Sequence, residues 1–209
     1  MTEPTKSGIS RRTLAKGAAW SVPAAAVVAA APAYAVSIPE PVIDFGNACG
    51  NTGATQKGCG GKKTLQVPLT LSNNTNADIV FQITSMYTCN CATAPTAAGA
   101  GVYSGVRGIW ATPSHTVANQ NKCTAPTGST CAGAATGTVS GAVSSVVVPA
   151  GATNKTYWIE SVVTNDSSNF ATTINWRLLT PGTPCTVLDT GMAKTTTAIS
   201  PQNCDGANK

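Results

Sequence analysis

Apolar and polar side chains alternate along several short stretches of the chain. Residues 65–71 carry four apolar side chains separated by Gln, Pro and Thr, and residues 79–83 repeat the alternation. A period of two is typical of a strand with one buried face. Residues 73–76 have the sequence Asn-Asn-Thr-Asn, which favours a turn, so we expect the two strands to form a hairpin. Because Pro68 has no N–H to donate, the first strand should lie at an edge or contain a bulge.

The same pattern predicts further strands toward the C-terminus. We expect them at residues 143–148, at 157–163, along the apolar face of Ile174, Trp176 and Leu178, and, from weaker patterns, at 186–190 and 194–200. Tyr157 and Trp158 are adjacent, so one of the two rings must face away from the core. No helical period of useful length occurs after residue 36, and the abundance of Thr from there to the C-terminus favours β structure.

This succession of short strands and turns predicts an all-β fold, an antiparallel β-sandwich that forms one domain at residues 36–209. We expect the immunoglobulin-like arrangement, although a jelly roll or an open barrel would give the same pattern. Residues 89–141 interrupt the pattern with Ala, Gly, Thr and Ser. They are expected to form an irregular, disulfide-tied insertion that contains one short strand at 106–111.

The N-terminal segment 1–35 differs from the rest of the chain and indicates a targeting function. The sequence Ser-Arg-Arg-Thr-Leu-Ala-Lys at residues 10–16 precedes an uncharged run at 17–30, and Ala-Pro-Ala-Tyr-Ala follows at 31–35. A charged region, a short apolar region and an A-x-A site together make a secretory signal. We therefore expect cleavage after Ala35.

Arg11 and Arg12 make this segment resemble a twin-arginine (Tat) signal, whose pattern is S/T-R-R-x-F-L-K. Ser10, both arginines and Lys16 match the pattern, Leu14 is a similar apolar residue, and the Ala-rich style is similar to exported proteins of high-GC Gram-positive bacteria. The resemblance implies the Tat translocase as a partner during export. It also implies a secreted or envelope-associated, extracytoplasmic protein.

Two other interpretations of the N-terminus stay open. One is a general-pathway signal with an incidental Arg pair. The other is an uncleaved anchor, because no charge occurs between Lys16 and Glu40, a span long enough to cross a bilayer. That stretch is mostly Ala and contains Pro23 and Pro32, so its insertion would be marginal. We expect no stable membrane span after cleavage.

The charge of the exported part argues against nucleic acid as a partner. Only 10% of the whole chain is charged, and in the segment 36–209 the basic side chains barely outnumber the acidic ones. No dense basic patch remains to neutralise phosphates. Disorder is also disfavoured, because 42% of the residues are hydrophobic.

An even number of cysteines in an exported chain predicts four disulfides. They are Cys49, Cys59, Cys89, Cys91, Cys123, Cys131, Cys185 and Cys204. Cys89 and Cys91 would share a strand face, so they should pair with different partners. Spacing suggests three pairs, which are Cys49 with Cys59, Cys123 with Cys131, and Cys185 with Cys204. A metal site or cofactor is not expected, because the chain has one His and no C-x-x-C.

Catalytic patterns are weak, and we predict no enzyme. His115, the only histidine, lies beside Ser114, but no G-x-S-x-G turn accompanies them. Glu160 and Asp166 flank one strand end as the two carboxylates of a glycosidase would, although most such pairs are solvated. A secreted hydrolase with an unrecognised site stays open as an alternative.

Binding residues are expected among exposed tryptophans and one basic loop. Trp110 and Trp158 are candidates because an exposed indole on a sandwich can stack on a sugar or anchor a partner. Lys57, Lys62 and Lys63 form a Gly-rich basic loop that would contact anionic wall polymers. The sequence thus favours a secreted, non-catalytic structural or interaction module of the cell surface or envelope, whose partner is a wall polymer, glycan or surface protein. A small-ligand carrier is the other alternative.

Overall fold

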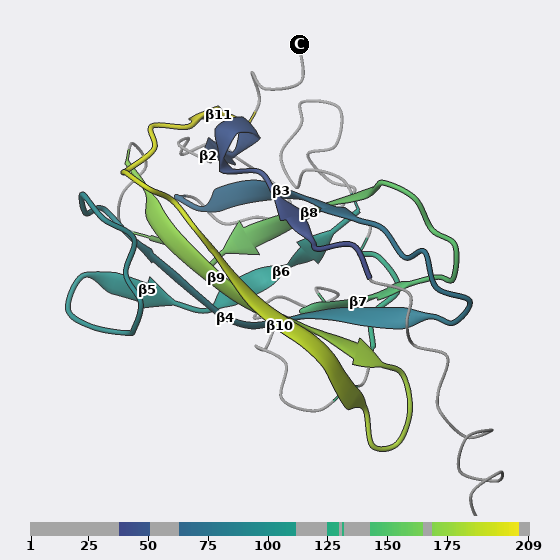
Figure 1. The fold of residues 1–209 in the computed structure, drawn as a ribbon. Coiled ribbons are helices and arrows are strands. Elements are labelled where there is room, and N and C mark those ends of the chain that lie inside the picture. The colour runs from purple at the N-terminus through teal and green to yellow at the C-terminus, as the bar shows by residue number, and fades with distance from the viewer. Residues whose placement is uncertain are drawn as a thin grey trace, which may run out of the picture. The chain divides into compact units, whose positions relative to one another are not determined.

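Two β-sheets packed face to face form the part of the chain that the computed structural model describes (Figure 1). It describes residues 38–50, 63–111, 125–129, 131, 143–164 and 169–204. All of these residues belong to one compact unit that begins at Ile38. The predicted all-β sandwich is therefore confirmed.

The first sheet contains the strands that carry the candidate site. They are β1 (Val42–Ile43), β2 (Cys49–Gly50), β3 (Leu65–Leu71), β6 (Val106–Trp110), β8 (Lys155–Ser161) and β11 (Gln202–Asn203). Their order is β11-β2-β3-β8-β6, and β1 also pairs with β3. A single 3₁₀ turn, η1 (Phe45–Asn47), separates β1 from β2.

The second sheet contains the longer strands. They are β4 (Ile79–Cys89), β5 (Val102–Ser104), β7 (Ser145–Val148), β9 (Ala171–Thr180) and β10 (Thr186–Lys194). Their order is β10-β9-β4-β5, and β7 pairs with the beginning of β4. Among the described residues, no helix has the length and apolar character that crossing a membrane requires.

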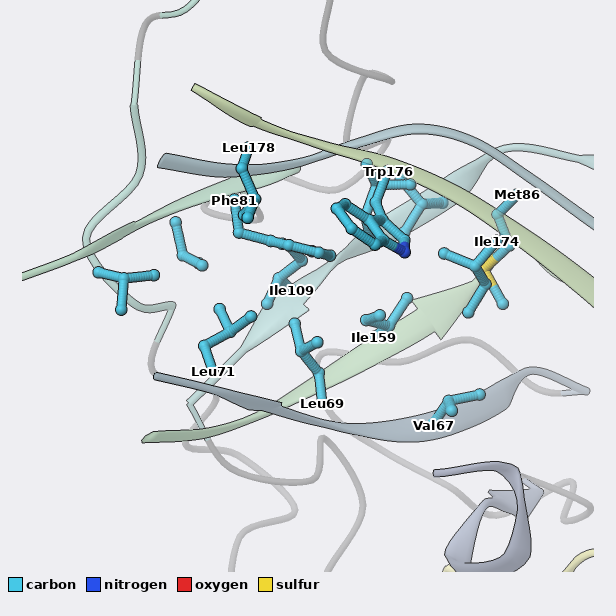
Figure 2. Packing of buried hydrophobic residues seen from close by; sticks show 14 of the residues in the cluster. Val67, Leu69, Leu71, Phe81, Met86, Ile109, Ile159, Ile174, Trp176 and Leu178 are labelled. Carbon is cyan, nitrogen blue, oxygen red and sulfur yellow. The ribbon is translucent and has the colours of Figure 1, made fainter. Parts of the chain in front are cut away.

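The core lies between the two inner faces, and the alternation in the sequence explains it (Figure 2). The four apolar residues of β3 point inward and are at most 2% exposed. Phe81 and Trp176 of the opposite sheet belong to the same core cluster, and the centroids of their two rings are 6.2 Å apart. The prediction that Trp176 belongs to the core is confirmed, since it is 3% exposed.

The predicted hairpin of residues 65–83 is wrong, because β3 and β4 belong to different sheets. The turn residues instead cross from one sheet to the other. Buried Asn73 holds this crossing, since its Nδ2 donates to the carbonyls of Ala77 and Val148, each at 2.9 Å. Alternation identifies the buried face of a strand, but both strands would show the same alternation in one sheet or in two.

Pro68 does not place β3 at an edge, as we expected, because β3 has neighbours on both sides. β8 pairs with one side, and β1 and β2 pair with the other. The turn η1 lies between β1 and β2, so the strand opposite Pro68 is interrupted at the point where this residue cannot donate. The neighbouring chain therefore contains the irregularity, and Pro68 costs the ladder no hydrogen bond.

The segment 89–141 is less irregular than predicted. Its strand at 106–111 is confirmed as β6, and all five of its residues are buried as part of the first sheet. β5 was not predicted; it pairs with the end of β4. Much of the segment 112–142 lies outside the described residues, so its irregular conformation stays a prediction.

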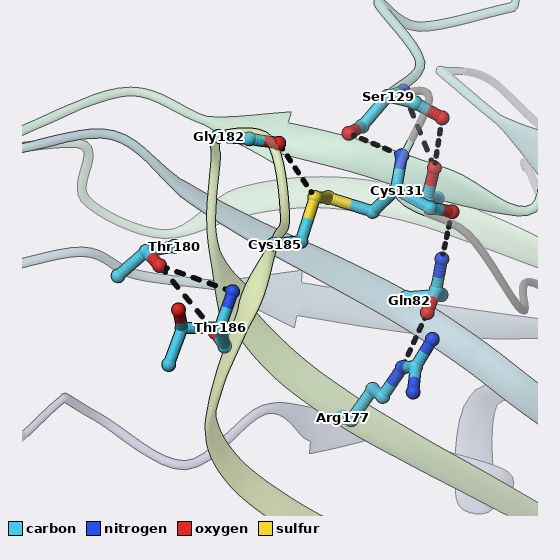
Figure 3. Close-up of a disulfide and its surroundings, with 9 residues drawn as sticks. Gln82, Ser129, Cys131, Arg177, Thr180, Gly182, Cys185 and Thr186 are labelled. Carbon is cyan, nitrogen blue, oxygen red and sulfur yellow. Dashed lines mark hydrogen bonds between the residues drawn. A yellow bond between two sulfur atoms is a disulfide. The ribbon is translucent and has the colours of Figure 1, made fainter.

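Disulfides are present, but none of the described bridges joins a predicted pair. Figure 3 shows the bridge between Cys131 and Cys185. The bridges are Cys49–Cys204, Cys89–Cys91 and Cys131–Cys185. Cys59 and Cys123 lie outside the described residues. The prediction missed Cys49–Cys204 and Cys131–Cys185 because it followed proximity in the sequence, whereas the fold brings together residues 155 and 54 positions apart.

Cys89 and Cys91 pair with each other, contrary to our expectation that a shared strand face would separate them. β4 ends at Cys89 and the chain bends through residues 90–93, so Cys91 no longer lies on the strand. The two Cα atoms are 5.4 Å apart, within the range of a disulfide. The end of β4, rather than the strand itself, makes this pair possible.

Candidate functional site

Trp158 and Trp110 lie side by side on the outer face of the first sheet. Their neighbours Ile159 and Ile109 point into the core, and side chains alternate across a strand, so both indoles point outward. Register places Trp158 opposite Pro68 on one side and opposite Trp110 on the other. Tyr157 packs on the core, which confirms that one ring of this neighbouring pair faces away.

Trp110 is not an exposed binding residue, and that prediction is corrected. Only 2% of its surface is exposed. Its Nε1 donates to Oε2 of Glu160 at 2.9 Å, and Oγ1 of Thr64 donates to the other carboxylate oxygen at 2.8 Å. Both oxygens of a fully buried carboxylate thus accept from neighbouring side chains, and Trp110 acts as a structural donor.

Trp158 keeps its place as a candidate, because it is partly exposed and lines a surface hollow of about 650 Å³. Pro68 lies beside it, and Phe45 of η1 adds a second aromatic ring to the lining. The remaining described lining residues are Asp44, Gly46, Asn47, Ala48, Ile199, Ser200, Pro201 and Gln202. The hollow therefore combines an apolar floor with a rim of amide, hydroxyl and carboxylate groups.

One wall of the hollow is the turn that Asp44 builds. Its Oδ1 accepts from the backbone N–H of Gly46 at 2.9 Å and of Asn47 at 3.2 Å, and its Oδ2 accepts from Nδ2 of Asn47 at 2.6 Å. The hydrogen bond from the Asn47 side chain has the largest effect on the pKa of Asp44. Together with the two backbone donors it outweighs burial, which acts in the opposite direction, and the pKa lies below its usual value of 3.8. Asp44 is therefore ionised at neutral pH.

A second wall is the C-terminal segment 199–202, which three connections hold in place. Ile199 and Phe170 exchange backbone hydrogen bonds of 2.8 and 2.9 Å. Gln202 then pairs with Cys49 of β2, and the Cys49–Cys204 disulfide closes the connection two residues later. Both walls are consequently fixed by the fold before any ligand arrives.

Of the three lysines of the basic loop, Lys63 lies within the described residues. Lys57 and Lys62 lie outside the described residues. Lys63 has a positive φ of 60°, and its carbonyl accepts from the N–H and Oγ1 of Thr164 at 2.8 and 2.9 Å. It does not line the hollow with Trp158, so the structure does not bring the predicted Lys and Trp candidates into one described site.

Other residues that the sequence singled out for export or catalysis also lie outside the described residues. They are Arg11, Arg12, Ala35, Ser114, His115 and Asp166. Within the described ranges, no three His, Cys, Asp or Glu side chains gather closely enough to hold a metal ion.

Sequence reasoning missed most of the lining of the hollow. Asp44, Gly46 and Asn47 carry a recognisable signal, because an Asp followed by Gly and Asn favours a side-chain-capped turn. Gln202 has no local signal. It reaches the site only through the pairing of β11 with β2, which joins the two ends of the folded chain.

A second hollow of about 500 Å³ lies near the Cys131–Cys185 bridge, between β9 and the turn at residues 181–185. Arg177 lines it and donates from Nε to Oε1 of Gln82, whose Nε2 donates to the carbonyl of Cys131 at 2.9 Å (Figure 3). This chain of contacts ties the segment near residue 131 to the outer face of the second sheet. The cation is thus engaged in holding the bridge region.

Comparison with known proteins adds no relative. No protein-family model, no curated protein and no solved structure matches the chain.

Proposed function

We propose that this protein is a non-catalytic interaction module of the cell envelope, exported through a Tat-type signal, and that it holds its partner in the hollow beside Trp158. The observation that carries the proposal is this hollow, whose two walls are fixed by the Asp44 turn and by the bridged C-terminal segment. A preformed site on a rigid scaffold loses little ordering entropy on binding.

Two features support other parts of the proposal, the extracytoplasmic location and the type of sandwich. The described disulfides indicate an oxidising compartment. The strand order β2-β3-β8-β6 facing β10-β9-β4-β5 has the sequence of neighbours A-B-E-D and G-F-C-C′, which supports the immunoglobulin-like assignment as part of the proposal. Fold alone does not identify a partner, so the site carries the argument.

The hydrolase alternative loses one of the candidate residues on which it depended, whereas Ser114 and His115 lie outside the described residues. Glu160 is fully buried and accepts hydrogen bonds from Trp110 and Thr64. A carboxylate engaged in this way supports the sheet. The carrier alternative retains one favourable observation, because about 650 Å³ is enough for a small molecule. A molecule that copurifies with the native protein would favour the carrier.

The test is retention of the exported protein on the envelope of the cells that export it. The full-length chain and its Trp158→Ala and Met192→Ala variants are expressed, recovered after export and incubated with washed envelope. Met192 is the matched control, since it is an apolar residue 51% exposed on β10, away from the hollow. We expect retention to fall about tenfold in the Trp158 variant and to stay unchanged in the control.

Circular dichroism of the variants shows that the comparison concerns folded proteins. Equal retention of all three proteins would contradict the place of the site. No retention of the native protein would contradict the function itself.

A further inference from the structure

We infer that the hollow beside Trp158 binds a neutral saccharide, and that it excludes the anionic polymers of the envelope. The inference rests on the proposed function and names the ligand class of the same site. It follows from the shape, the polar groups and the charge of the lining.

The apolar part of the hollow matches one face of a sugar ring. Trp158 and Pro68 lie directly opposite each other in adjacent strands, and Phe45 contributes a second ring from η1. A pyranose has a face of C–H groups, which packs on flat apolar surfaces, and a perimeter of hydroxyls, which must be hydrogen-bonded. A purely apolar ligand would leave the rim of this hollow unpaired.

The polar rim matches that perimeter in kind. Asp44 Oδ2 accepts one hydrogen bond from Asn47 and can accept another, since a carboxylate has about four acceptor positions. Asn47 retains its carbonyl oxygen and a second amide hydrogen. Gln202 adds an exposed amide, and the Ser200 hydroxyl, which donates to Asn169 at 2.5 Å, can accept. Hydroxyl groups both donate and accept, so they can use each of these positions.

The charge of the lining separates neutral from anionic ligands. Its described residues include one carboxylate, Asp44, and no Lys or Arg. Because the Asn47 side chain and backbone donors keep the pKa of Asp44 low, the carboxylate is ionised at neutral pH. A phosphate-rich polymer would meet this negative charge, and none of the described lining residues would compensate it with a cation. We therefore expect any binding of such a polymer to be independent of Trp158.

Calorimetric titration with defined probes tests the inference. The full-length chain is expressed, and the protein recovered after export is titrated with neutral oligosaccharides of glucose, mannose, galactose and N-acetylglucosamine, and with polyglycerol phosphate. We expect at least one neutral oligosaccharide to bind and to compete for envelope retention. Trp158→Ala should weaken this binding about tenfold, Trp158→Phe should restore much of it, and Met192→Ala should leave it unchanged.

Asp44→Asn is the variant that tests the role of charge. The amide oxygen can still accept from the turn, but the negative charge is lost. We expect weaker binding of the neutral sugar by roughly three- to tenfold, as for loss of a charged hydrogen-bond acceptor. Binding of polyglycerol phosphate, if any, should not depend on Trp158.

The outcomes separate the inference from the proposed function. If the envelope retains the protein through Trp158 but none of the neutral sugars binds or competes, the ligand class is wrong and the function stands. If a sugar binds through Trp158 but the envelope does not retain the protein, the ligand class stands and the function is wrong. Binding of polyglycerol phosphate that Trp158→Ala abolishes would overturn the inference.

Discussion

Three described tryptophans illustrate how neighbours assign different roles to one residue type. Trp176 is buried against Phe81, Trp110 is buried beside Glu160, and Trp158 is partly exposed in a hollow. Trp110 and Trp158 share a sheet face but differ in exposure, and the buried Trp110 donates a hydrogen bond to a buried carboxylate. The sequence predicted the core position of Trp176 from its apolar periodicity. It could not separate the other two, because period two shows the face and not what covers it.

Glu160→Gln should destabilise the protein without removing any activity. The amide has only one acceptor oxygen, so either Trp110 or Thr64 would face an NH₂ group instead of an acceptor. We expect a loss of about 1–3 kcal/mol in the free energy of unfolding, measured by urea denaturation. Unchanged stability together with loss of hydrolysis in a broad substrate panel would favour a catalytic Glu160.

Gly191→Ala should also destabilise the protein, because the Trp176 indole lies directly against the Gly191 backbone. An added Cβ would lie 2.5 Å from Cε2 and 2.8 Å from Cη2 of Trp176. We expect a cost of about 1–3 kcal/mol, typical of overpacking. The control is Gly99→Ala, since its Cβ meets nothing within 4 Å. Equal urea midpoints for the two variants would contradict the packing.

The Asp44 turn should weaken in acid. Its pKa is lowered in the folded protein, so the stabilisation is present above the unfolded value near 3.8 and is lost as the pH falls through the folded value. Asp44→Asn should make stability less pH-dependent below about pH 4, by roughly a few tenths of a kcal/mol because the group is solvent-screened. Parallel pH profiles of both proteins between pH 5 and 2.5 would show that the turn contributes no such linkage.

At the scale of elements, alternation predicted strands well and their partners poorly. β3, β4, β6, β7, β8, β9 and β10 coincide with predicted strands, although several boundaries differ. The strand expected at 194–200 is wrong, since β10 ends at Lys194 and Ile199 forms only an isolated bridge with Phe170. The hairpin failed because Asn73 directs the chain across to the other sheet, which depends on a contact with Val148, 75 residues away. The position of Pro68 inside a sheet depends likewise on η1 in a different segment. Local pattern contains no information about such distant contacts.

The site was predictable to the extent that its residues carry a local signal. Trp158 was identified because its ring must face away from the core if Tyr157 faces inward. The C-terminal wall could not be predicted, because only the β2–β11 pairing and the Cys49–Cys204 bridge bring it there. Disulfide partners in general depend on the finished fold, so spacing alone misassigned them.

Removal of the Cys49–Cys204 bridge should affect both stability and binding. Replacing both residues with Ser removes a cross-link between residues 155 positions apart. We expect the free energy of unfolding to fall by roughly 2–5 kcal/mol. Without the bridge, the C-terminal wall of the hollow is held less firmly, so we also expect weaker binding of the sugar. The Cys89→Ser, Cys91→Ser pair is the matched control, since its bridge spans only two positions and restricts the unfolded chain far less. A larger loss in that control would contradict this reasoning.

At the scale of the whole molecule, two sheets, cross-links and an outward-facing hollow form a scaffold suited to an extracytoplasmic environment. Covalent bridges hold the C-terminal wall to β2 and the β9–β10 turn to residue 131. The nearly balanced charge of the segment 36–209 suits contact with uncharged polymers better than with nucleic acid. The expected order of events is folding in the cytoplasm, export, and oxidation of the cysteines outside.

The Arg pair provides the prediction at this scale. Replacing Arg11 and Arg12 together with Lys keeps every charge but removes the guanidinium groups that define the Tat signal. We expect export to stop and uncleaved protein to accumulate in the cytoplasm, measured by fractionation and blotting. Lys6→Arg is the control and should be exported normally. Normal export of the double-Lys variant would favour the general pathway.

The most direct test of the exported, cross-linked scaffold is the intact mass of the protein from medium and envelope, measured natively and denatured after thiol alkylation without reductant. We predict the mass of residues 36–209 less eight hydrogens, with no alkylation, and with Cys49–Cys204 and Cys131–Cys185 among the bridged peptides. Alkylated cysteines with a bound metal ion in the native spectrum would contradict the scaffold. An uncleaved mass confined to the envelope would contradict the exported, cleaved form.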